Sequence, residues 1–114
     1  MYLKRDLEET IRKSLSKKEI IAVVGPRQCG KTTIINNILS EHKKVNNISF
    51  DDVKVLHLFE NDIDSFIDLH VKKYDYLFID EIQYSKDSGK KLKYIYDSQE
   101  IKILISGAED PEIS

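Results

Sequence analysis

The sequence is poor in cysteine and in long apolar runs. Its 114 residues include a single cysteine, Cys29, so no disulfide can form within the chain. The three histidines, His42, His57 and His70, do not share a metal-ligand spacing with that cysteine, which argues against structural zinc. No apolar stretch approaches the roughly 20 residues that cross a bilayer, and the N-terminus lacks the apolar core of a secretion signal. We therefore expect a cytoplasmic protein without a membrane segment.

The chain also lacks a strong excess of charge of either sign. Its formal net charge is -2, with 33% charged and 40% hydrophobic residues. This balance provides no global attraction to nucleic acid or anionic lipid, so the sequence leaves a nucleic-acid partner unknown. Repeats, low-complexity tracts and linkers are absent. The composition is that of one small globular domain with a genuine core.

Helical and strand-like patterns alternate along the chain. An apolar residue recurs every four positions in residues 1–16, which predicts an amphipathic helix. The run EIIAVV at 19–24 is apolar on both faces, as is typical of a central buried strand. A helix is expected to begin near Lys31. Its apolar face would comprise Ile34, Ile35, Ile38 and Leu39.

The second half of the chain continues the alternation. Residues 46–50 form a weaker strand-like run, and residues 63–71 suit a helix capped by Asn61 or Asp62. Strands are predicted at 74–81 and 101–106, with a lysine-rich helix around Leu92 between them. Alternation of this kind indicates an α/β fold with a parallel sheet.

Residues 25–32, GPRQCGKT, match the phosphate-loop pattern G-x-x-x-x-G-K-[ST] between a predicted strand and a predicted helix. Glycines let the backbone N–H groups approach a polyphosphate, and the helix N-terminus adds positive potential. Lys31 would neutralise the β- and γ-phosphates, and the Thr32 hydroxyl would bind Mg²⁺. The predicted nucleotide-binding residues are Gly25, Pro26, Arg27, Gln28, Cys29, Gly30, Lys31, Thr32 and Thr33. A chance glycine turn is the alternative.

Two strand ends carry further candidates. The strand YLFID ends in Asp80, which could hold magnesium, and is followed by Glu81, which could orient and deprotonate a water. Ser106, at the end of the last strand, could hold that water beside the γ-phosphate. Acidic residues also end strands simply because solvent is reached, and a serine often begins a turn. Gln83 either responds to the nucleotide or faces solvent.

GPRQCGKTT, the mid-chain FDD, FIDEIQ and the closing LISG together resemble the AAA-type ATPases of archaea and bacteria. The resemblance implies a three-layer P-loop NTPase fold, AAA/RecA-like, with ATP and Mg²⁺ as ligands. It also implies that Lys31 and Thr32 bind phosphate and magnesium, Asp80 supports magnesium, Glu81 is the catalytic base and Ser106 is the first sensor. In such a fold the strand near 101–105 lies between the phosphate-loop strand and the acidic strand.

Members of this family continue into a fifth strand, a lid and a C-terminal domain. We therefore expect residues 1–114 to form a single partial ATPase domain, truncated after the fourth core strand. Its N-terminal helix would span 1–16 and its nucleotide-binding core 19–107. The phosphate-loop strand would then lie on a sheet edge, open to self-association or to a lid or C-terminal domain supplied in trans.

Three functions fit these residues. The leading one is Mg-dependent hydrolysis of ATP to ADP and phosphate. A nucleotide-binding interaction module that does not hydrolyse is the second, and a small-molecule kinase, disfavoured by the Asp-Glu pair, is the third. The absence of a guanine-reading Asn/Thr-Lys-x-Asp motif modestly favours ATP.

Overall fold

The computed structural model describes residues 9–13, 20–25 and 31–108. Residues 9–13 are helical. The elements that follow are β1 (Ile21–Gly25), α2 (Lys31–Leu39), β2 (Val45–Ser49), α3 (Val53–Asn61), α4 (Ile63–His70), β3 (Tyr76–Asp80), the 3₁₀ turn η2 (Ile82–Tyr84), α5 (Ser88–Ser98) and β4 (Lys102–Ala108). None of the described helices has the length and apolar character that a membrane span requires.

The four strands pair in parallel in the order β1-β4-β3-β2. The last strand therefore lies between the phosphate-loop strand and the acidic strand, as expected. In the described sheet β1 is an edge strand, as the expectation of a partial domain implied, and not the central strand that its apolar run suggested. Ile21 and Val23 are buried on one side of β1, while Ala22 is exposed on the other. An apolar run is thus compatible with a strand that is covered on one face alone.

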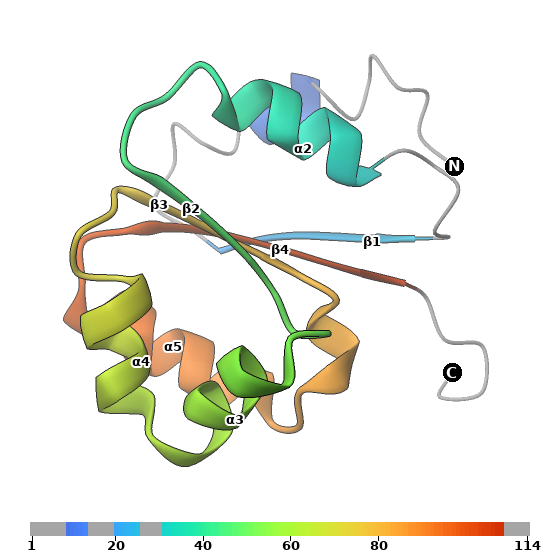
Figure 1. Cartoon of the computed structure of the whole chain (residues 1–114). Coiled ribbons are helices and arrows are strands. Elements are labelled where there is room, and N and C mark those ends of the chain that lie inside the picture. The colour runs from blue at the N-terminus through green and yellow to red at the C-terminus, as the bar shows by residue number, and fades with distance from the viewer. Residues whose placement is uncertain (1–8, 14–19, 26–30, 109–114) are drawn as a thin grey trace.

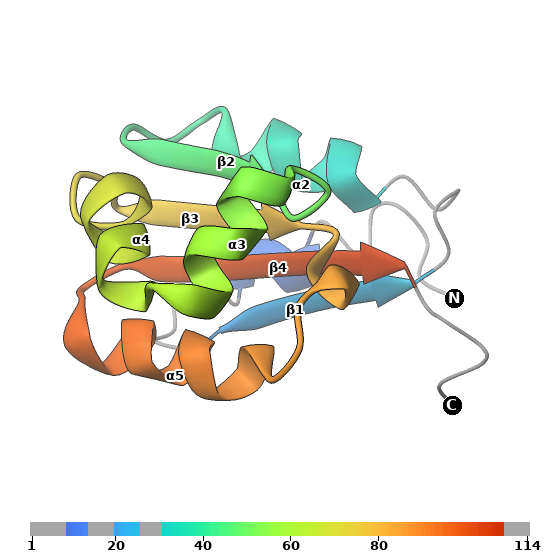
Figure 2. The same ribbon diagram turned by 60° about the horizontal axis from the view of Figure 1, so that its bottom comes forward.

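The sheet separates two helical layers (Figure 1). α2 and the helical residues 9–13 cover one face, where Ile11 packs in the same cluster as the α2 residues. α3, α4 and α5 cover the opposite face (Figure 2). The fold is therefore a three-layer α/β sandwich with a parallel sheet. All four apolar residues predicted for α2 are buried: Ile34, Ile35, Ile38 and Leu39.

Aspartates begin the two helices that follow β2. The Asp52 side chain accepts a hydrogen bond from the Lys54 N–H at 3.0 Å and caps α3, a helix that the sequence patterns did not predict. Asp62 caps α4 by accepting from the Ser65 N–H at 3.2 Å, so Asp62 rather than Asn61 serves as the cap. Such caps satisfy N–H groups that have no partner within the helix.

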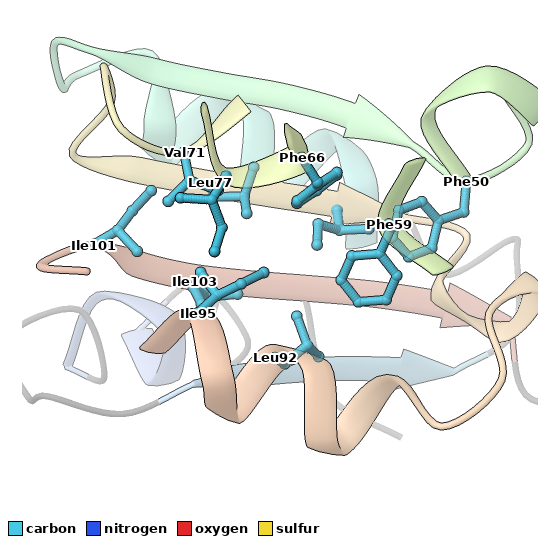
Figure 3. Packing of buried hydrophobic residues seen from close by; sticks show 11 residues of the cluster. Phe50, Phe59, Phe66, Val71, Leu77, Leu92, Ile95, Ile101 and Ile103 are labelled. Carbon is cyan, nitrogen blue, oxygen red and sulfur yellow. The ribbon is translucent and has the colours of Figure 1, made fainter. Parts of the chain in front are cut away.

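A row of phenylalanines fills the core beneath α3 and α4 (Figure 3). The Phe59 ring lies with its centroid 4.8 Å from that of Phe50 and 5.1 Å from that of Phe66. All three side chains are essentially inaccessible to solvent. Phe50 directly follows β2, so this packing fixes where the chain leaves the sheet and enters α3.

We predict that Phe59→Ala lowers the free energy of unfolding by about 3–5 kcal/mol, because it removes the central ring of the row and leaves a cavity. Urea denaturation followed by circular dichroism measures the change. The control is Val53→Ala on the same helix, where the side chain is 77% exposed and a change within about 0.5 kcal/mol is expected. Equal losses in the two variants would contradict the packing described here.

Candidate functional site

The phosphate-loop motif connects β1 to α2. The described chain reaches the motif at Gly25, which pairs with Ala108 of β4, and resumes at Lys31, the first residue of α2. The start of α2 lies at the same end of the sheet as the carboxyl ends of the strands (Figure 1). Five of the predicted binding residues fall outside the described residues: Pro26, Arg27, Gln28, Cys29 and Gly30. Backbone N–H groups at a helix start favour an anion at this end of the sheet.

Thr32 and Asp80 meet across the layers of the fold. The Thr32 hydroxyl donates a long hydrogen bond of 3.4 Å to Oδ2 of Asp80. Thr32 is the second residue of α2, and Asp80 is the last residue of β3. Thr33, which follows, is exposed. The two residues predicted to hold magnesium therefore lie in direct contact.

This pair suits Mg²⁺ by its chemistry. A hydroxyl oxygen and a carboxylate oxygen are hard ligands of the kind that magnesium takes, usually with several waters retained. The long hydrogen bond leaves both oxygens weakly engaged with each other. Oδ1 of Asp80 accepts a bond of 2.9 Å from the Glu81 N–H, which helps to hold the carboxylate in orientation.

The backbone turns sharply at Glu81. Its φ and ψ of 58° and 44° lie in the left-handed region, which costs a residue with a Cβ roughly 1–2 kcal/mol. The turn ends β3 and leads directly into η2. Strained backbone of this kind gathers at functional sites, where the surrounding structure maintains it.

Ser106 lies on the α2 side of the sheet. It pairs with Val23 of β1, and it shares a strand face with Leu104, which packs in the α2-side core. The side chain is fully buried, and its Oγ has no hydrogen-bond partner among the described residues. Since Ile79 pairs with Ile105, Asp80 and Ser106 occupy matching positions at the ends of adjacent strands. A buried hydroxyl without a partner is unusual in a stable core, which makes this position a candidate for contact with a ligand or water.

Gln83, whose role the sequence left open, does not simply face solvent. Its Nε2 donates to Oε2 of Glu81 at 3.1 Å, while its Oε1 is buried without a partner in the described part of the chain. The position of Gln83 two residues after the acidic pair was the only signal in the sequence. The contact itself depends on the turn at Glu81, which no sequence pattern indicated.

Comparison with known proteins places the chain among nucleotide-binding folds. The model of a family described as AAA domain matches residues 17–114. A search of curated proteins finds no match to this chain. Two solved structures are similar: Pif1 helicases in a study of DNA unwinding at forked duplex DNA, and a double mutant of Pif1 helicase from Bacteroides. Each superposes with a TM-score of 0.60 at 16% identity over 95% of this chain, and 34% and 32% of the respective helicase chains are covered. The chain thus spans about a third of their length and shares their fold.

We predict that Ser106→Ala stabilises the fold by about 1 kcal/mol, because it removes a buried hydroxyl that has no partner in the described part of the chain. Chemical denaturation measures the effect. Ser98→Ala is the control, since the Ser98 hydroxyl donates to the Tyr94 carbonyl at 2.7 Å and its loss should leave stability unchanged or slightly lower. A clear loss of stability in the Ser106 variant would indicate that its hydroxyl has a partner in solution.

Proposed function

We propose that this chain, which belongs to the AAA domain family, binds MgATP and hydrolyses it to ADP and phosphate. The observation that carries the proposal is the contact between Thr32, at the end of the phosphate-loop motif, and Asp80, at the end of the acidic strand. These residues are 48 positions apart in the sequence. Their meeting at the carboxyl edge of a parallel sheet is the arrangement expected of a nucleotide site in an open α/β fold.

Phosphate binding is assigned to the phosphate-loop motif and the start of α2. Lys31 would pair with the β- and γ-phosphates, and the helix N-terminus supplies N–H donors and positive potential. Thr32 and Asp80 would hold magnesium, which would neutralise phosphate charge during transfer.

Water activation is assigned to Glu81 and Ser106. Glu81 would accept a proton from the attacking water, while the Ser106 hydroxyl would hold that water beside the γ-phosphate. Ser106 is suited to this because its Oγ is buried and has no partner among the described residues. The new bond forms between the water oxygen and phosphorus as the bond to the ADP oxygen breaks.

Calorimetric titration with MgATP tests the binding step. We expect saturable binding by the wild-type chain and roughly ten- to hundredfold weaker binding by Lys31→Ala, the loss that follows from removing one charge-assisted contact. Lys90→Ala, at an exposed position on α5, should bind as the wild type does. Equal affinity in all three proteins would contradict the assignment of Lys31.

Measuring phosphate release distinguishes hydrolysis of ATP from binding of ATP without hydrolysis. Glu81→Gln should lower the turnover of ATP by about 10²–10⁴-fold while keeping its affinity, because the amide cannot accept the proton. The matched control is Glu100→Gln, at an exposed position before β4, which should turn over normally. If the wild type binds MgATP yet releases no phosphate, the nucleotide-binding module without hydrolysis is the better description.

A further inference from the structure

The side-chain amide of Gln83 has two ends with different surroundings. Its Nε2 donates to the Glu81 carboxylate at 3.1 Å, whereas its Oε1 is buried and accepts no hydrogen bond from the described residues. Rotating the amide by half a turn would place its carbonyl oxygen against a carboxylate oxygen, where two acceptors repel. The carboxylate therefore selects this orientation, even though it leaves the carbonyl unsatisfied.

Gly107 provides the space into which the amide carbonyl points. A Cβ at this position would lie 2.6 Å from Oε1 of Gln83 and 2.9 Å from Cγ2 of Ile82. A real Cβ does not make contacts this short, so a side chain at position 107 would force the Gln83 amide and the Ile82 side chain to move, whereas the Gln83 backbone N, at 3.6 Å, would stay in ordinary contact. The missing side chain of Gly107 thus permits Gln83 to reach Glu81.

The space at Gly107, against which Gln83 Oε1 lies, is on the face of β4 opposite to the Ser106 side chain. Gly107 follows Ser106, so the positions of their side chains point to opposite faces of β4. Gln83 makes no hydrogen bond with Thr32 or Asp80 in the described residues, and those two residues belong to the binding step. A change at Gln83 can therefore reach the proposed base without touching the proposed magnesium ligands.

We infer that Gln83 is a positioning residue for hydrolysis, which holds the Glu81 carboxylate through its amide and is itself seated against Gly107. This inference rests on the proposed function, in which Glu81 is the base. Glu81 is itself the residue with the left-handed backbone and carries a flexible side chain, so the hydrogen bond from Gln83 helps to keep its carboxylate in one orientation. A base that is displaced by a fraction of an ångström to an ångström loses much of its effect on the rate while the substrate still binds.

The kinetic test uses Gln83→Met, which keeps the length of the side chain and removes its amide. We expect kcat to fall roughly ten- to hundredfold, with KM and the calorimetric affinity for MgATP within about twofold of wild type. Gln99→Met, the same change at the C-cap of α5, should leave all three values unchanged. An unchanged kcat in Gln83→Met, or an equal loss of affinity and rate, would overturn the inference.

Gly107→Ala tests independently whether the space at Gly107 is needed to position the Gln83 amide. The added Cβ should displace Gln83 and lower kcat by a similar factor, with the affinity for MgATP retained. Gly89→Ala is the control because a Cβ there meets nothing within 4 Å. Retained affinity also shows that the Gly107 variant is folded, and full activity in that variant would contradict the role of this space.

An NMR measurement that does not depend on ATP turnover tests the inference independently of the proposed function. The Gln83 side-chain NH₂ resonances, identified by their loss in Gln83→Met, should shift in Glu81→Gln because their charged acceptor is gone, while those of Gln99 stay in place. If the wild type hydrolyses no ATP, the proposed function fails, and the shift alone decides whether Gln83 holds Glu81. Unchanged Gln83 resonances would overturn the inference even in an active enzyme.

Discussion

The strand β4 pairs in parallel with β1 on one side and with β3 on the other, and the candidate site depends on this pairing. Parallel pairing brings the carboxyl ends of three strands to one edge of the sheet. The register then places Ser106 beside Val23 and level with Asp80. Because α2 starts at the same edge, the Thr32 hydroxyl reaches the Asp80 carboxylate. Slipping one strand by a single residue would turn these polar groups to the other face.

Three costly local features lie at this edge of the sheet. Glu81 adopts a left-handed backbone, and both Ser106 Oγ and Gln83 Oε1 are buried without partners among the described residues. The rest of the described core is closely packed, with aromatic rings in contact on the α3 and α4 side. A protein tolerates such features where function requires them and the surrounding packing supports them. Their clustering beside the phosphate-loop motif supports a role for this edge in chemistry.

Sequence patterns predicted most of the fold but missed one helix, and they gave two different positions for β1. α3 was not predicted because its segment starts with two β-branched residues separated by a lysine. In the structure Asp52 caps this helix and the buried Phe59 side chain packs it against the core. The apolar residues of β1 suggested a central strand, whereas the resemblance to AAA-type ATPases suggested an edge strand, which is where β1 lies with Ala22 exposed. Small apolar residues tolerate either environment, so hydrophobicity alone does not separate an edge strand from a central one.

The sequence by itself determined the local chemistry: a phosphate-loop motif between a strand and a helix, an acidic pair at a strand end, and a serine at the end of the last strand. These depend on short-range spacing, which a sequence displays directly. Only the tertiary structure decided that Thr32 contacts Asp80, that Ser106 is buried without a partner among the described residues, and that Gln83 reaches Glu81. The last contact needs a left-handed turn and the space at Gly107 on a distant strand, and contacts between distant segments follow from strand order and packing.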